Sequence, residues 1–108
     1  MQAQAFALSS ATSLSLNSSN TSLGWTISKY KNHQIAFSDL GGVNATIWVF
    51  PAAAGANQYS IEPSVSADNK VKVFNFADYG PIGAFSIRFD AGFTGTVYFG
   101  SSETGAYD

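Results

Sequence analysis

GAFSIRFDAGFTGTVYF, residues 83–99, is the stretch of sequence that decides the fold. Its apolar side chains alternate with polar ones, first at Phe85, Ile87 and Phe89 and later at Val97 and Phe99. A period of two is the pattern of a half-buried β-strand. Two such runs separated by a short glycine-containing segment are typical of a β-hairpin. The stretch therefore predicts two antiparallel strands joined by a turn at residues 92–95.

The same alternation recurs along the rest of the chain, interrupted by turn-forming residues roughly every ten positions. Helical periodicity is nearly absent. This spacing predicts an all-β fold, an antiparallel β-sandwich of the jelly-roll or immunoglobulin-like type with about eight or nine short strands. We expect a single domain over residues 1–108, in which residues 1–22 form either an extended N-terminal arm or edge strands. The other expected strands cover residues 6–8, 14–16, 23–28, 33–38, 43–50, 58–65 and 70–76.

One of these expected strands is ambiguous about its buried face. Val71 and Val73 alternate with Lys70 and Lys72, which predicts valines toward the core and lysines toward solvent. Phe74 then falls on the lysine face, against that prediction. We therefore expect either a β-bulge, in which one extra residue reverses the alternation, or a change of environment near Phe74.

Charged residues are scarce and unevenly spread. Asp, Glu, Lys and Arg make up 11% of the chain, compared with about 25% in an average globular protein, and residues 1–28 and 40–61 contain none. The net charge of −2 and the scattered basic residues argue against nucleic acid as a partner. An uncharged polar surface suits burial between subunits of an assembly, and a merely tolerated polar β surface is the alternative. Neither stretch predicts a membrane span or a signal peptide, so we expect a complete soluble chain.

The two uncharged stretches supply the candidate interface. In the second, Trp48 and Phe50 occupy one face of a strand whose other face is also apolar. A strand that is apolar on both sides needs a second cover, either a loop of its own chain or a neighbouring subunit. Pro51 ends this strand and a small, apolar loop follows it. The candidate interface residues are Phe6, Leu8, Leu14, Trp48, Phe50, Pro51 and Ala53.

The sequence offers no constellation for catalysis or metal binding. His33 is the only histidine, there is no cysteine, and no serine has the sequence context of a nucleophile elbow. Most of the seven acidic residues fall at expected turns or at the chain end, where turn formation accounts for them. Zinc, calcium and phosphate-cradling motifs are missing from the sequence. We therefore expect a protein that is not an enzyme, with no catalytic residues, no metal and no cofactor.

Binding of a carbohydrate or another small ligand is the alternative function. Aromatic rings can stack on sugar rings, and the sequence places Trp48, Tyr79 and Tyr98 outside the expected core alternation or at a turn. These three are the candidate ligand-stacking residues.

Residues 83–91 and 92–99 also carry a resemblance to a family. An arginine-bearing strand that leads through a Thr-Gly turn into a Thr-Val strand resembles the closing strands of small β-sandwich proteins of bacteriophage particles. The charge-poor, cysteine-free composition is similar to that of capsid decoration, cement and tail-associated modules. The resemblance implies a virion protein, assembled in the host cytoplasm, that docks on and stabilises a capsid or tail lattice. It implies a homo-oligomer, with a trimer favoured, whose partner is a major capsid or tail protein. On this view, deleting residues 2–16 would abolish docking and leave the domain folded.

Overall fold

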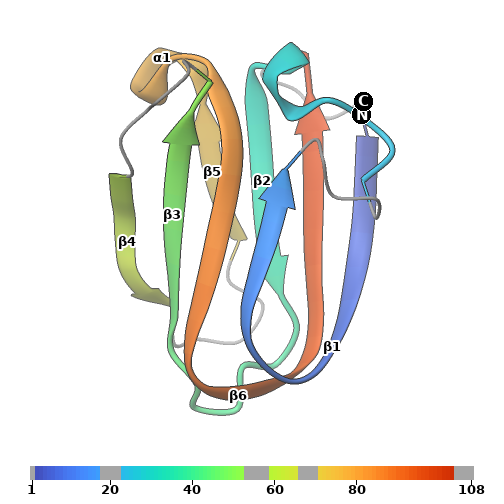
Figure 1. Cartoon of the computed structure of the whole chain (residues 1–108), viewed down its shortest axis with the longest axis vertical. Coiled ribbons are helices and arrows are strands. Elements are labelled where there is room, and N and C mark those ends of the chain that lie inside the picture. The colour runs from blue at the N-terminus through green and yellow to red at the C-terminus, as the bar shows by residue number, and fades with distance from the viewer. Residues whose placement is uncertain (1, 18–22, 53–58, 66–70, 104–108) are drawn as a thin grey trace.

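The alternating segments form strands, and every ladder between them is antiparallel. The structure is a computed structural model that describes residues 2–17, 23–52, 59–65 and 71–103. The predicted antiparallel all-β class is confirmed, and the only α-helix in the described part is one turn long. The elements, shown in Figure 1, are β1 (Gln2–Asn17), a 3-10 turn (Ile27–Lys29), β2 (Asn32–Phe37), β3 (Ala45–Pro51), β4 (Tyr59–Val65), β5 (Val71–Asn75), α1 (Phe76–Tyr79) and β6 (Ile82–Ser102).

The stretch expected to be a hairpin is a single bent strand. Figure 1 shows β6 running along one side of the molecule, turning at the bottom and returning on the other side. Its first half pairs with β3 and its second half pairs with β2, and the two halves of β6 share no ladder with each other. The hairpin prediction at residues 92–95 is therefore wrong. Phe93 is buried and stacks on Phe89 with ring centroids 4.7 Å apart, so the bend crosses the end of the core instead of projecting into solvent.

Strand β1 follows β6 around this bend. Its ladder runs from Gln2, opposite Ser101, to Asn17, opposite Ala84, with register shifts between residues 8 and 13. Ser10 lies at the bend with a φ of 49°, a conformation uncommon for a residue other than glycine. Its backbone N–H donates to Thr94 Oγ1 at 2.9 Å, which ties the two bends together. Residues 6–8 and 14–16, expected as two strands, are thus parts of one.

The described strands form one open sheet of six, in the order β4-β3-β6-β2-β5, with β1 paired to β6 outside this path. The bends divide it into two arms. The front arm contains β4, β3, the first half of β6 and the second half of β1, and the back arm contains the remaining strands and half-strands. Rings of the two arms meet, with centroids 5.5 Å apart for Phe85 and Phe99. The sheet is continuous, and its six described strands are fewer than the eight or nine expected, because β1 and β6 each take the place of two expected strands.

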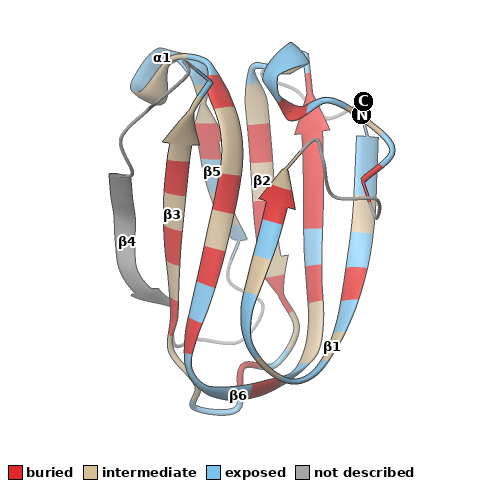
Figure 2. Cartoon of the chain, in the orientation of Figure 1, coloured by how far each residue is buried: buried red, intermediate tan, exposed pale blue. Residues whose placement is uncertain are grey.

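The core lies between the arms. Figure 2 shows buried positions recurring along β2, β3 and β6 at alternate residues. Five phenylalanines, Phe37, Phe74, Phe85, Phe93 and Phe99, are each at most 1% exposed. Complete burial of one such side chain contributes about 1.5–3 kcal/mol, so these rings dominate the stability of a chain that has no disulfide.

Two further local predictions are wrong. Residues 23–28 do not form a strand. Leu23 and Ile27 are buried as their alternation predicts, but the segment ends in the 3-10 turn. In β5 the valines, not Phe74, face solvent, and the ladder to β2 contains no bulge. The physical reason is size. The ring of Phe74 contacts Phe85 at 5.2 Å between centroids and buries more apolar area than a valine would.

Candidate functional site

The outer face of the back arm carries an unusual group of exposed side chains. The ladders place Ala5, Tyr98, Ala36 and Val71 in one row across four strands. A second row, one pleat away, holds Ala3, Gly100, Gln34 and Val73. Directly paired residues of antiparallel strands point to the same side of a sheet, so the eight residues share one surface. We call this surface the Tyr98 face.

Three apolar side chains of the Tyr98 face are open to solvent. Tyr98 is 49% exposed, Val71 is 49% exposed and Val73 is 54% exposed. The fourth exposed large hydrophobic residue in the described part, Phe76, lies on α1, with Lys31 Nζ 5.8 Å from its ring centroid. No residue of the Tyr98 face is charged. Exposed apolar patches on soluble proteins often mark contact sites, so the Tyr98 face is a candidate contact surface.

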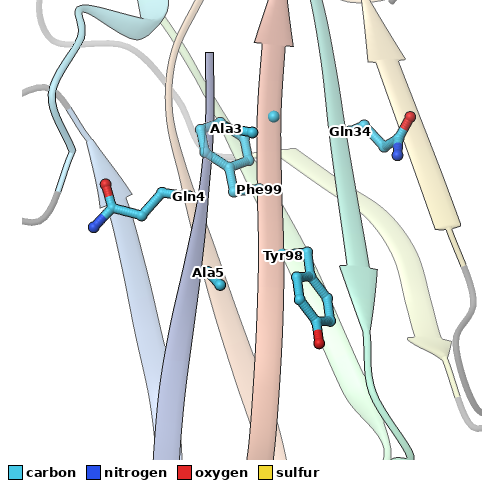
Figure 3. A pocket seen from close by; sticks show the side chains of 7 residues that line it. Ala3, Gln4, Ala5, Gln34, Tyr98 and Phe99 are labelled. Carbon is cyan, nitrogen blue, oxygen red and sulfur yellow. The ribbon is translucent and has the colours of Figure 1, made fainter. Parts of the chain in front are cut away.

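A shallow depression of about 250 Å³ lies in the Tyr98 face. It is open on one side and forms where Gly100, Ala3 and Ala5 provide little or no side chain beside Tyr98. Figure 3 shows the Tyr98 ring beside β6 and the Gln4 side chain extending in the other direction. The residues that line the depression are Ala3, Gln4, Ala5, Gln34, Tyr98, Phe99 and Gly100.

The structure separates the interface residues expected from the sequence into several environments. Phe6 is 8% exposed and belongs to the core, and Leu8 and Leu14 pack against the core from the same side of β1. The exposed residues of β1 are therefore the alternate ones, such as Ala5 and Ser13. A contact surface on β1 would consist of those exposed residues.

Three of the other interface residues lie on the front arm. Trp48 and Phe50 are on the outer face of β3 and are half-buried, and Pro51 ends the strand in a similar state. The indole Nε1 of Trp48 is buried and has no hydrogen-bond partner. Ala53 lies outside the described residues. Phe6, Leu8 and Leu14 face the core, whereas Trp48 and Phe50 are on the outer face of β3, so these residues do not form one surface.

The three candidate ligand-stacking residues are also separated. Tyr98 is on the back arm, Trp48 is on the outer face of the front arm, and Tyr79 packs against the core with its ring 6.0 Å from Phe74. Only Tyr98 borders the depression.

His33 and Ser101 form a hydrogen-bonded pair in the core. Ser101 Oγ lies 2.8 Å from His33 Nδ1 and also accepts from Trp25 Nε1 at 3.2 Å. Both residues are 0% exposed, and His33 lies against the rings of Phe85 and Phe99. Burial lowers the pKa of His33 to about 4, although a backbone hydrogen bond with Tyr30 opposes the shift. A serine beside a histidine is part of a nucleophile arrangement, but no substrate can reach a pair enclosed by aromatic rings.

The described residues contain no group of three or more His, Cys, Asp or Glu side chains that could hold a metal ion. The same part of the chain contains no helix long and apolar enough to cross a membrane. The acidic residue Asp90 has a structural role, because its carboxylate accepts from both the backbone N–H and the side-chain amide of Asn44 at 3.0 Å.

The exposure of Val71 and Val73 was missed by sequence reasoning. Their alternation with lysines favoured the opposite orientation, because a charged side chain is normally the exposed one. The available signal was Phe74, whose ring shares the face of Lys72 and is the largest apolar group in the strand.

Comparison with known proteins adds little to these observations. No protein-family model and no curated protein sequence matches the chain. Among solved structures, a chain from infectious bursal disease virus, Gx strain, is similar at a TM-score of 0.39 and 10% sequence identity. The similarity covers 99% of this chain and 34% of the viral chain, so this chain spans about a third of that protein. A likeness of this size carries no argument about function.

Proposed function

We propose that the chain is a non-enzymatic structural protein of a virus particle, which docks on an assembled capsid or tail lattice and stabilises it as a decoration or cement protein. The observation that carries the proposal is the exposed, charge-free surface over β1 and the Tyr98 face. In this proposal the two arms act as a β-sandwich whose outer surfaces are contact surfaces.

The lack of charged residues favours a surface that is buried in a protein contact over one that stays exposed to solvent. An exposed charge in a contact surface has to lose its water, which costs free energy unless it finds a partner. The sixteen residues of β1 carry no charge, and most of them are exposed or half-buried. Free monomeric proteins usually keep charges on such a strand, because charged edges oppose unwanted pairing.

The stabilising mechanism would be mass action. A protein that binds only the assembled lattice stabilises it by RT ln(1 + [L]/Kd), which is about 3 kcal/mol at a hundredfold excess over Kd. Many copies on one particle multiply the effect. The partner would be a major capsid or tail protein, and the docked copies would form a homo-oligomer.

The sequence resemblance to bacteriophage particle proteins contributes less than these surfaces. It depends on residues 83–99 as two strands joined by a turn, whereas those residues form part of one bent strand. The surface composition does not depend on that turn.

Binding of a neutral carbohydrate is the second candidate, and the depression beside Tyr98 is the observation that favours it. A sugar site needs several convergent polar groups besides an aromatic ring. Gln34 and Gln4 are the side-chain amides that line the depression, the Gln4 side chain extends away from Tyr98 (Figure 3), and the other two candidate stacking residues lie elsewhere. A protein–protein contact therefore agrees better with the residues around the depression than a carbohydrate site does.

Sedimentation of virus particles tests the proposal. Particles are purified on a density gradient from lysates of the organism that encodes the chain, and the chain is quantified in each fraction by mass spectrometry. We expect the chain to sediment with particles at a constant ratio to the major particle protein. Recovery of the chain only at the top of the gradient, in repeated preparations that contain intact particles, would overturn the proposal.

A further inference from the structure

We propose that the Tyr98 face binds the same face of a second copy of this chain, about a two-fold axis. The inference deepens the proposed function and rests on it for its biological setting, because copies held on a lattice need a surface through which they contact one another. It names that surface and its partner.

The first argument is the chemistry of the face. Val71, Val73 and Tyr98 are each about half exposed, and the five positions between them are alanine, glycine or glutamine. β-branched and aromatic side chains on a pleated surface pack well against another sheet. A partner with positively or negatively charged side chains in its contact surface would bury those charges without an opposite charge to pair with, which is unfavourable. A second copy of the face carries no charge and meets this requirement.

The second argument is shape. The Tyr98 ring is 49% exposed, and it borders the depression of about 250 Å³ that Gly100 also lines. In a two-fold contact, residue i of one copy meets residue j of the other, and j meets i in return. Under that symmetry, an exposed side chain beside a depression can fit the depression of the second copy, while the second copy's side chain fits the depression of the first. The Tyr98 ring of each copy would enter the depression beside Gly100 of the other.

The third argument is position. Val71 and Val73 are on β5, an end strand of the sheet order, and Ala3 and Ala5 are on β1, which pairs only with β6 among the described strands. The four strands between these borders present a continuous surface. Tyr98, Val71 and Val73 are each about half exposed, so the described part of the chain leaves these side chains open to solvent.

Area sets the expected strength of the contact. Four strands about 4.8 Å apart, each contributing about five residues at 3.4 Å as β5 does, give a footprint of roughly 330 Å². A stable interface buries about 800 Å² on each partner. The isolated contact should therefore be weak, and copies fixed on a lattice would strengthen it by avidity. A two-fold contact produces dimers, so a trimer, favoured from the sequence, would need another surface.

Sedimentation equilibrium over protein concentrations from 10 µM to 1 mM tests the inference. We expect the wild-type chain to shift with concentration from its monomer mass of 11.4 kDa toward twice that mass. Val73→Glu places a charge in the contact, and Tyr98→Ala removes the exposed ring. Both variants are expected to weaken association at least tenfold. Ser13→Glu is the matched control, because Ser13 is an exposed strand residue on the front arm, and it should associate as wild type.

Near-UV circular dichroism and thermal melting confirm that each variant is folded before it is compared. A wild-type chain that stays monomeric at 1 mM overturns the inference. So does association that Val73→Glu and Tyr98→Ala leave unchanged, which would assign the contact to another surface such as the β1 edge. A monomer whose Tyr98 resonances shift on adding maltohexaose or chitohexaose also overturns it and assigns the depression to a sugar.

The two proposals fail separately. Recovery of the chain in particles together with unchanged association of Val73→Glu would retain the structural function and reject the Tyr98 face. Dimerisation through the Tyr98 face by a chain that never sediments with particles would reject the virion function and retain the contact.

Discussion

At the scale of single residues, size and burial override the polarity that the sequence pattern emphasises. His33 is fully buried between aromatic rings, and its Nε2 has no hydrogen-bond partner. Phe74 is buried although it shares a face with Lys72. Both are cases in which a residue's environment comes from neighbours distant in the chain, and such neighbours cannot be identified from one sequence.

The buried histidine makes stability depend on pH. The pKa of His33 is lowered from 6.5 to about 4, mainly by desolvation. The unfolded chain therefore binds a proton near pH 6.5 that the folded chain binds only near pH 4. The free energy of unfolding is highest above pH 6.5 and falls as the pH decreases toward 4, by about 3 kcal/mol in total. Urea unfolding at several pH values between 7 and 4.5 measures this slope.

His33→Gln is the control for that dependence, since glutamine retains hydrogen-bonding groups and does not titrate. We expect it to be less stable than wild type at pH 7 and to show a flatter slope between pH 6.5 and 5. An unchanged slope in the variant would show that other groups cause the pH dependence.

Gly95 is a position where a single methyl group should destabilise the fold. An added Cβ would lie 2.6 Å from Ser38 Oγ and 2.7 Å from the buried ring of Phe93. Ser38 Oγ cannot move freely, because it accepts a hydrogen bond from the backbone N–H of Thr96 at 2.9 Å. Gly95→Ala is expected to cost about 1–3 kcal/mol in urea unfolding.

The matched control is Gly24→Ala, because a Cβ at Gly24 meets no atom within 4 Å. It should change the free energy of unfolding by no more than about 0.5 kcal/mol. Equal effects of the two substitutions would contradict the proposed crowding at Gly95.

At the scale of elements, β1 and β6 hold the two arms together. Their ladder extends from residues 2 and 101 to residues 17 and 84, and Phe6 and Leu16 bring β1 into the core of both arms. β1 is thus an integral strand of the sheet. A deletion that removes it exposes core residues of β6 and leaves a long edge unpaired.

Deletion of residues 2–16 is therefore expected to unfold the domain, contrary to the expectation drawn from the sequence. Near-UV circular dichroism should lose its native signal. Leu16→Ala offers a milder version, since Leu16 is 0% exposed, and should cost about 2–5 kcal/mol. Ala7→Ser, at an exposed position of the same strand, serves as its control. A truncated chain that retains a native spectrum would show that β1 is dispensable.

The elements that alternation alone defines could be predicted. The strand segments at β2, β3, β4 and β5, and the inward positions Ile35, Phe37, Ile47 and Val49, agree with the sequence pattern. The connection between the halves of β6 could not be predicted. Glycines such as Gly92 and Gly95 suit both a bend across a core and a hairpin turn, and the two are distinguished by the strands that pair with each half of β6. For the Tyr98 face, the sequence suggested Tyr98 as a surface residue. Its alternation pattern placed Val71 and Val73 toward the core, whereas both are exposed.

At the scale of the whole molecule, the fold depends on contacts between distant parts of the chain. The ladder between β1 and β6 joins residues about as far apart as a chain of 108 allows. Such contacts form only after a large loss of chain entropy. Folding cannot be completed until the last strand is present.

Refolding is therefore expected to be slow, in the range of milliseconds to seconds that is typical of β proteins dominated by distant pairings. Stopped-flow fluorescence of Trp25 and Trp48 after dilution from urea measures the rate. Complete refolding within microseconds would contradict a folding transition that depends on the β1–β6 ladder.

The pairing of residues 2 and 101 also determines how the molecule responds to mechanical force. Tension applied between those two positions would open the β1–β6 ladder from its end, rupturing one hydrogen-bonded pair after another. Tension applied along the back arm, from the bend of β6 at residue 93 to residue 101, would act parallel to the strands and would load many pairs together. The domain should thus yield at low force when pulled by its paired ends and resist when loaded along its strands.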